Sequence, residues 1–449
     1  MTDQSQRGPT LARTVNLPQL ALYGLGSMLG AGIYGLIGKA AGEMGNAVWL
    51  AFLVSMVAAL LTGLSYASLG SRYPRAGGAA YVTQRAYGLP LLTYLVGLTV
   101  MASGLTSVAT QSRVVAEALT RLPLFDGTPV LPLALGFLLL IAGIVYRGIR
   151  ESMWVNILCT VMEAGGLLIV IAVGLPYWGG VNLLEVPPAS GGIGPTLLLQ
   201  GAVLTFFSFI GFEDTYNVAE EVKDPQRTLP WAIIIAMACA TVIYLAVAVT
   251  AVSVVPWQEL ATASAPLVEV AHRAAPWIPG AVFVVITVFA VSNTALLNYI
   301  MASRLAYGMA RLDLLPRALG RVHARRRTPH VAIAVLLAIV TALMLSGDIA
   351  QLASATVLLL LAVFTIVNVA LLVLQRRTAE VKGAFEVPSF VPAAGAAICA
   401  LLFCNRLFTG DWQAPALAIG LLAGIVVLYL VMRPKCVDKL DEAESLPLE

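Results

Sequence analysis

The feature that constrains this chain most is a series of apolar runs that are each about 20 residues long. An α-helix rises about 1.5 Å per residue, so a run of this length crosses the roughly 30 Å hydrocarbon core of a bilayer. The composition agrees, because 59% of the 449 residues are hydrophobic and only 11% are charged. We therefore expect an all-α polytopic membrane protein with twelve transmembrane helices, at residues 18–42, 47–70, 90–118, 130–147, 153–175, 195–218, 230–255, 280–310, 330–346, 350–375, 388–408 and 413–433.

Lysine and arginine residues set the expected orientation of these helices. Most of the 27 basic residues fall on one side of a twelve-helix topology, in the N-terminal tail and in alternate loops. The positive-inside rule then places both termini in the cytoplasm, as tails at residues 1–17 and 434–449. The first apolar run lacks a small-residue cleavage site, so we expect no signal peptide and a location in the cell membrane. The net charge of +3 follows from this distribution and gives no indication of a nucleic-acid partner.

Side chains that bind metals or perform covalent catalysis are sparse. The five cysteines have no metal-ligand spacing, and none of His272, His323 and His330 falls in mid-membrane. A membrane-embedded enzyme would need such a cluster or a serine activated by a base. The sequence shows neither, although Ser27 and Ser208 lie near glycines. We expect no cofactor, no metal site and no enzymatic activity.

Two acidic residues interrupt the sixth apolar run. Residues 205–230 read TFFSFIGFEDTYNVAEEVKDPQRTLP, and Glu213 lies roughly 27 Å from the start of that run at 1.5 Å per residue. A carboxylate at membrane depth costs about 2.5–3.5 kcal/mol on insertion scales, so Glu213 and Asp214 are candidate functional residues unless they are paired or hydrated. The run is expected to break at residues 207–210. Carboxylates just beyond an unwound, hydrated break are stable without carrying protons.

The first apolar run is rich in glycine, which weakens a helix interior by up to ~1 kcal/mol relative to alanine. One interpretation is close helix packing through the GxxxG step from Gly26 to Gly30. The other is a break at Gly30, Ala31 and Gly32. Such a break exposes amide groups at bilayer depth and points the positive N-terminus of the following half-helix inward.

The fifth run carries a carboxyl group near the bilayer midplane. Glu163 lies ~15 Å from the expected cytoplasmic end of the helix. Asn156, Thr160 and Glu163 occupy positions i, i+4 and i+7, so they form one polar stripe that must face the protein interior. Glu163 is either a structural carboxyl that stays protonated or a group that carries protons. Asn293 lies near the middle of the eighth run, where helix–helix hydrogen bonding and substrate coordination explain it equally well.

The two halves of the chain have corresponding interruptions. Runs one and six each open a block of five runs, and each of these two runs is broken within its own length. This pattern predicts an inverted-repeat transporter whose substrate binds at the midplane. We expect a transporter core at residues 18–375, made of repeats at 18–175 and 195–375, with two further helices at 376–433.

Three motifs resemble those of the amino acid-polyamine-organocation (APC) superfamily of permeases. They are GSMLGAGIYG at residues 26–35, YASLGSRYPRAGGAAYVTQRAYG at 66–88 and FFSFIGFEDTYNVAEEVKDPQRTLPWAI at 206–233. The resemblance extends over nearly the whole chain. It implies the LeuT-type fold, in which a 5+5 inverted repeat surrounds a central substrate with discontinuous helices 1 and 6.

The resemblance also implies which groups bind the substrate. In this family the carboxylate of an amino acid binds amides of the first broken helix, and the amino group binds carbonyls of the sixth. The matching positions here are Gly30, Ala31, Gly32 and Ile33 for the carboxylate, and Phe207, Ser208 and Ile210 for the amino group. Phe207 would also be the aromatic gate between the substrate and the exterior. Half-helix dipoles favour the same arrangement.

Two positions depart from the family pattern. Glu163 stands where several sodium-independent relatives carry a lysine, and Ser68 stands where many relatives carry a glutamate. The charged residues after the sixth run are either an inner latch or a solvated loop. In the first case Glu220, Glu221, Lys223, Asp224 and Arg227 would pair with Arg72, Arg75 or Arg147.

These observations predict a secondary transporter that moves amino acids by alternating access, coupled to protons through Glu163 or working by exchange. Transport of polyamines or other organic amines is an alternative, because Glu213 adds negative charge near the site. A sensor built on a transporter fold is a further one. The expected partners are the small-molecule substrate, a proton and the lipid bilayer. Asn293 and Glu213 are additional candidate residues of the substrate site.

Overall fold

The computed structural model describes residues 11–75, 77–120, 125, 127–263, 266–345, 349–409 and 413–433. The first ten residues of the expected N-terminal tail and the whole expected C-terminal tail lie outside this part of the chain. The described residues are mainly helical and contain no strand beyond one isolated β-bridge. The helices are α1 (Leu17–Leu29), α2 (Ala31–Met44), α3 (Val48–Arg72), α4 (Gly78–Tyr87), α5 (Pro90–Leu119), α6 (Val130–Arg147), α7 (Ile149–Gly174), α8 (Pro195–Phe206), α9 (Asp214–Asn217), α10 (Pro225–Val254), α11 (Trp257–Thr262), α12 (Pro266–Ala274), α13 (Gly280–Arg311), α14 (His330–Leu345), α15 (Ile349–Arg376), α16 (Phe390–Thr409) and α17 (Gln413–Met432).

Several of these helices have the length and composition of membrane spans. Eight segments in the described chain are long and apolar enough to cross a bilayer, and three further apolar helices are shorter. The eight are Ile37–Arg72, Pro90–Leu119, Val130–Arg147, Ile149–Tyr177, Pro195–Asn217, Pro225–Val254, Val282–Arg311 and Leu358–Arg376. The protein is therefore an all-α polytopic membrane protein.

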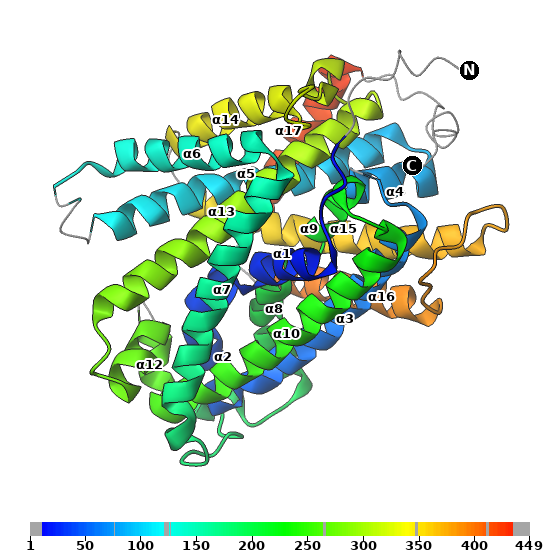
Figure 1. Cartoon of the computed structure of the whole chain (residues 1–449). Helices are drawn as coiled ribbons and strands as arrows, with labels where there is room; N and C mark the ends of the chain where they lie inside the picture. The colour runs from blue at the N-terminus through cyan, green and yellow to red at the C-terminus, as the bar shows by residue number, and fades with distance from the viewer. Residues whose placement is uncertain are drawn as a thin grey trace, which may run out of the picture.

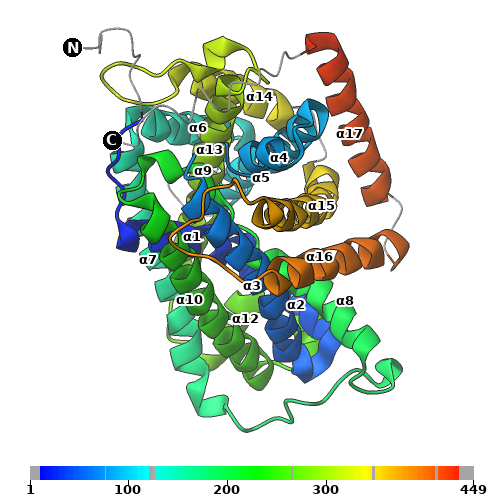
Figure 2. The same ribbon diagram turned by 90° about the vertical axis from the view of Figure 1, so that its right-hand side faces the viewer.

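The short helices α1 and α9 lie in the middle of the bundle (Figure 1), whereas α8 lies toward one edge of it (Figure 2). Helix α1 packs against α7, α10 and α13, while α8 packs against α2 and α3. At one edge of the molecule α17 packs against α15 and α5, and α16 packs against α15 and α3 (Figure 2). The two interrupted segments of the sequence thus each pack against longer, continuous helices.

Local sequence determines where α1 begins and ends. The Asn16 side chain accepts a hydrogen bond from the Gln19 N–H, and the Gln19 side chain accepts one from the Asn16 N–H, both at 3.1 Å. This reciprocal capping box satisfies two amides at the start of the helix. At the other end Gly30 adopts φ −47° and ψ −143°, which leaves the helical region, and α2 begins at Ala31. The first apolar run is therefore two helices that meet at Gly30.

The segment before α1 is attached to the chain between α9 and α10. The N–H groups of Thr14 and Val15 both donate to the Glu221 carbonyl oxygen at 3.0 Å, and the Lys223 N–H donates to the Val15 carbonyl oxygen at 2.9 Å. These bonds form the isolated parallel bridge between Val15 and Val222. The N-terminal segment and the end of the second interrupted region therefore form one unit.

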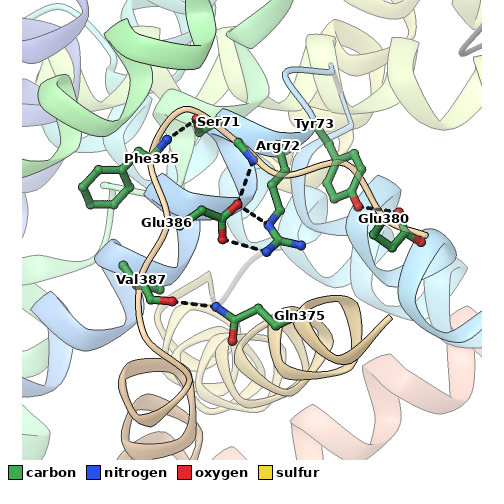
Figure 3. A network of polar contacts seen from close by, with 9 residues as sticks. Ser71, Arg72, Tyr73, Gln375, Glu380, Phe385, Glu386 and Val387 are labelled. Atoms are coloured by element: carbon green, nitrogen blue, oxygen red, sulfur yellow. Dashed lines mark hydrogen bonds and ion pairs between the residues drawn. The ribbon is translucent and has the colours of Figure 1, made fainter. Parts of the chain in front are cut away.

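The loop between α15 and α16 is fastened to the end of α3 (Figure 3). Arg72 donates two hydrogen bonds to the Glu386 carboxylate, at 2.8 and 2.6 Å. The Phe385 N–H donates to the Ser71 hydroxyl oxygen at 3.0 Å. A bidentate arginine–carboxylate pair fixes orientation as well as distance, so this loop, which we call the strap, holds α3 beside α15 and α16.

A second contact of the strap is made by Glu380. Its carboxylate accepts hydrogen bonds from the Tyr73 hydroxyl at 2.6 Å and from the Arg85 guanidinium at 3.1 Å. Burial alone would raise the pKa of Glu380, but the hydrogen bonds from Tyr73 and Arg85 and the charge of Arg85 bring it below its ordinary value. Glu380 therefore remains ionised and joins the strap to both α3 and α4.

Candidate functional site

A cavity of about 230 Å³ lies between the two interrupted segments and the helices α5 and α13. Gly30 and Gly32 line it from the first break, and Phe207, Ile210 and Gly211 line it from the second. The facing wall carries hydroxyl and amide side chains, among them Ser103, Thr106, Ser107 and Gln111 of α5 and Thr294 and Asn298 of α13. The cavity therefore combines exposed backbone groups with a polar wall.

The two breaks touch each other directly. A Cβ atom added at Gly32 would lie 2.6 Å from the Cα of Ser208. A Cβ atom at Gly211 would lie 2.7 Å from the carbonyl group of Ser27, and Gly211 has φ +128°, which favours glycine. Glycine at these positions is what allows the two backbones to approach.

The side chain of Tyr244 of α10 contacts the backbone of both breaks. Its side chain is fully buried, and its hydroxyl lies within hydrogen-bond distance of the Met28 carbonyl oxygen and, at 2.7 Å, of the Ser208 carbonyl oxygen. Met28 lies in the last turn of α1, where carbonyls have no helical partner. Tyr244 therefore bridges the two interruptions, because its single hydroxyl proton is shared between a carbonyl oxygen of each.

Both acidic residues of the sixth run line the cavity. The Ser27 hydroxyl donates to Asp214 Oδ2 at 2.6 Å, and the Gly211 N–H donates to Glu213 Oε2 at 2.8 Å. Glu213 is 6% exposed and Asp214 is 4% exposed. No lysine, arginine or histidine lines the described part of the cavity. The charged side chains of the site are thus acidic, and an ionised carboxylate is a hydrogen-bond acceptor only.

Glu163 lies in a separate polar cluster that joins α7 and α13. The Asn293 amide donates to Glu163 Oε2 at 3.4 Å and to Thr160 Oγ1 at 2.9 Å, and the Asn156 amide donates to Asn293 Oδ1 at 2.9 Å. All four side chains are fully buried, so the predicted polar stripe faces the interior. Glu163 Oε1 has no hydrogen-bond partner among the described residues. The cluster thus holds a carboxyl group with one free oxygen.

The glycines of the GxxxG step also serve close packing. A Cβ atom at Gly26 would lie 2.2 Å from Thr160 Oγ1, and one at Gly30 would lie 2.3 Å from Thr294 Oγ1. The two interpretations of the glycine-rich run are therefore both realised. α1 packs closely on α7 and α13 through these glycines, and it also ends at Gly30.

The structure places the expected site residues in different surroundings. Gly30, Gly32, Phe207, Ile210 and Glu213 line the cavity. Ile33 and Ser208 are buried next to it without lining it, while Glu163 and Asn293 belong to the α7–α13 cluster. Ala31 is the first residue of α2, and its side chain lies outside the described part of the structure.

The α5 wall of the cavity is absent from the sequence-based interpretation. Gln111 donates to the Ser107 hydroxyl at 2.8 Å, and Asn298 of α13 approaches the same hydroxyl at 3.4 Å. Ser103, Ser107 and Gln111 follow one another at i, i+4 and i+8, as one helix face requires. That spacing of polar residues within an apolar run is the signal that could have identified this wall.

One acid of the inner-latch hypothesis, Glu221, is paired with a residue that the hypothesis did not name. Glu221 forms a bidentate pair with Arg304 of α13, with both N–O distances at 3.0 Å and both side chains 0% exposed. Arg72, one of the expected partners, is instead bound to Glu386 of the strap. Arg304 lies in a long apolar helix, so its pairing with Glu221 depends on tertiary contacts that the sequence does not display.

Comparison with known proteins gives consistent similarities. The family described as "Amino acid permease" matches residues 15–430. The chain is 28% identical to the branched-chain amino acid permease BcaP of Bacillus subtilis, over 94% of each protein. It is 30% identical to the methylthioribose transporter of the same species, over 95% of each. It is 29% identical to mouse cationic amino acid transporter 4, over 84% of this chain and 62% of that protein.

Proposed function

Because this chain belongs to the amino acid permease family, we propose that it is a secondary transporter that carries amino acids across the cell membrane by alternating access. The family and the names of the relatives point to a transporter rather than an enzyme. A permease for branched-chain amino acids and a transporter for cationic amino acids stand among those relatives. They favour amino acids over polyamines and other organic amines as the substrate class.

For the topology, we propose twelve transmembrane helices with both termini in the cytoplasm. In this arrangement α1 and α2 are the halves of the first helix, and α8 and α9 are the halves of the sixth. Repeats at residues 18–175 and 195–375 then form a LeuT-type core at 18–375, followed by the last two helices at 376–433. The interruptions at Gly30 and after Phe206 support this proposal, because they open the two proposed repeats.

The cavity between the two breaks is the observation that carries the substrate proposal. The free amides at the start of α2, from Gly30 to Ile33, suit the carboxylate of an amino acid, since a helix N-terminus favours anions. The carbonyls of Phe207, Ser208 and Ile210 suit its ammonium group, since the Ser208 oxygen keeps a second lone pair beside its bond from Tyr244. Glu213 and Asp214 add negative charge nearby. Phe207, which is half-buried at the cavity, would be the gate.

We propose Glu163 as the proton-carrying group for coupling. Its protonated form could donate a hydrogen bond, and its ionised form could only accept one. The change would act on Asn293 and on the packing of α1, because the cluster contacts α1 at Gly26. Exchange of one amino acid for another is the alternative mode, and it would need no titrating group.

Uptake of radiolabelled amino acids into proteoliposomes tests both parts of the proposal. Phe207→Ala should impair saturable uptake. Glu163→Gln should abolish the stimulation of uptake by an inward proton gradient. Glu151→Gln, an exposed position on the same helix, is the matched control. A Glu163→Gln variant with full gradient dependence would refute the coupling role. Binding of amino acids without any flux or trans-stimulation would instead indicate a sensor.

A further inference from the structure

Exposed arginines gather where the turn between α6 and α7 meets the loop between α13 and α14. Arg147 and Arg150 flank the turn, and Arg325 and Arg326 lie in the loop. A Cβ atom at Gly148 of the turn would lie 3.8 Å from the Arg326 carbonyl oxygen, so the two segments are in contact. None of the four arginines forms an ion pair within the described chain. We call these four residues the basic patch.

One acidic residue, Glu151, lies beside the basic patch. Its Oε2 atom would lie 2.7 Å from a Cβ at Gly148, and it makes no ion pair with a described residue. One carboxylate does not neutralise four guanidinium groups. The patch therefore retains a net positive charge at the end of two apolar helices.

Hydrogen bonds hold the loop of the basic patch in one shape. The His323 N–H donates to the Thr328 carbonyl oxygen at 2.8 Å, and the Thr328 hydroxyl donates to the Tyr146 carbonyl oxygen at 3.1 Å. The Tyr146 ring also packs edge-on against His323, with a centroid distance of 5.8 Å. The arginines of the loop are thus attached to the end of α6 rather than to a free segment.

An apolar face of α7 leads away from the basic patch. Trp154, Leu158 and Val161 follow Arg150 at helical spacing and are 61%, 54% and 56% exposed. Tryptophan at this place is typical of a membrane interface. The face continues into a groove of about 390 Å³ between α7 and α13, lined by apolar residues that include Gly165. A Cβ atom at Gly165 would meet nothing within 4 Å, so the groove is open at that point.

We propose that this surface binds an anionic phospholipid, with its headgroup phosphate on the basic patch and one acyl chain in the groove between α7 and α13. Guanidinium groups match phosphate in charge and in geometry. Arg150 and Gly165 are about 22 Å apart along the helix at 1.5 Å per residue, so the two parts of the site lie at headgroup depth and at acyl depth. A zwitterionic phospholipid also has a phosphate but carries no net charge, so it would compensate the arginines less, and a soluble anion would leave the groove unused.

The proposed acyl site lies directly behind the polar cluster of α7 and α13. A Cβ atom at Gly166, which lines the groove, would lie 3.4 Å from the Tyr34 hydroxyl, and that hydroxyl donates to the Glu163 carbonyl oxygen at 3.1 Å. A bound chain therefore packs against the helix pair that positions Glu163. The lipid would stabilise that pair whether or not Glu163 carries protons, so the inference is independent of the transport mechanism.

Lipid binding can be measured by native mass spectrometry and by thermal unfolding of the purified protein, with phosphatidylglycerol compared with phosphatidylcholine. The double variant Arg325→Gln/Arg326→Gln should bind phosphatidylglycerol about 30-fold more weakly, since each basic residue near an anionic headgroup contributes roughly a fivefold step. Gly165→Leu places a side chain in the groove, where the Cβ itself meets nothing within 4 Å, and should also weaken binding of phosphatidylglycerol.

Matched controls separate this site from general effects. Lys223→Gln/Arg227→Gln removes two exposed charges elsewhere, and Gly143→Leu places the same side chain at an open glycine of α6. Both should retain wild-type lipid binding. Equal binding of the two lipids by the wild type, or equal loss in the control variants, would overturn the proposal. Stabilisation by inorganic phosphate alone would overturn it as well, because a phosphate site needs no groove.

Discussion

Removal of the negative charge of Glu221 tests the buried ion pair that joins α13 to the segment before α10. Both partners are 0% exposed, so Glu221→Gln leaves the Arg304 guanidinium buried without a counter-charge. Breaking a buried pair from one side costs about 3–5 kcal/mol, whereas replacing both partners by apolar residues is often neutral or stabilising. We therefore expect Glu221→Gln to lose roughly 3–5 kcal/mol and the double variant Glu221→Leu/Arg304→Met to recover most of it.

Thermal unfolding in detergent of the wild type, Glu221→Leu, Arg304→Met and the double variant gives the coupling energy between the two side chains. Asp313→Asn is the matched control, because its partner Arg317 is 83% exposed and exposed pairs contribute about 0–1 kcal/mol. A double variant no more stable than Glu221→Gln would refute the reasoning. The loss would then come from the altered shape of the segment and not from an unpaired arginine.

Three further perturbations follow from the contacts of the site and of the strap. Gly32→Val should abolish amino acid uptake into proteoliposomes while the protein still elutes as a single species, since its Cβ would lie 2.6 Å from the Ser208 Cα; uptake at the wild-type rate would show that the two breaks separate freely. Tyr244→Phe should cost about 1–3 kcal/mol in thermal stability and raise the KM for uptake, because the one donor shared by carbonyls at the two breaks is lost; an unchanged KM would exclude a positioning role. The pKa of Glu380 is lowered in the folded protein, so its contribution to stability is present above its ordinary pKa and is lost as the pH falls through the folded value. Between neutral pH and about pH 3.5, the wild type should therefore lose more thermal stability than Glu380→Gln, and parallel curves would contradict this.

Much of the helical framework and part of the site could be predicted from local sequence. Apolar runs identify membrane-spanning helices because hydrocarbon tolerates few polar residues. The glycines around Gly30 and Gly211 indicate breaks because no other residue fits a close backbone approach or a positive φ so readily. The spacing of Asn156, Thr160 and Glu163 predicts one buried face, which is what the structure has.

Other features depend on pairings between distant segments. Arg304 is one charge within an apolar helix, and nothing near it in the sequence indicates that its partner is Glu221. Arg72 likewise could pair with several acids until the strap brings Glu386 to it. Tyr244 contacts the site through carbonyl groups, which every residue carries, so its role has no sequence signature.

The attachment of the N-terminal segment has a consequence for biosynthesis. Thr14 and Val15 are synthesised well before their backbone partners, Glu221 and Lys223. The bridge cannot close until the chain has been synthesised past residue 223. The ion pair of Glu221 cannot form until Arg304 has been synthesised as well. Contacts of such large sequence separation form late and slowly. The emerging chain therefore contains α1 before these partners exist, and a truncation before residue 304 removes the arginine that pairs with Glu221.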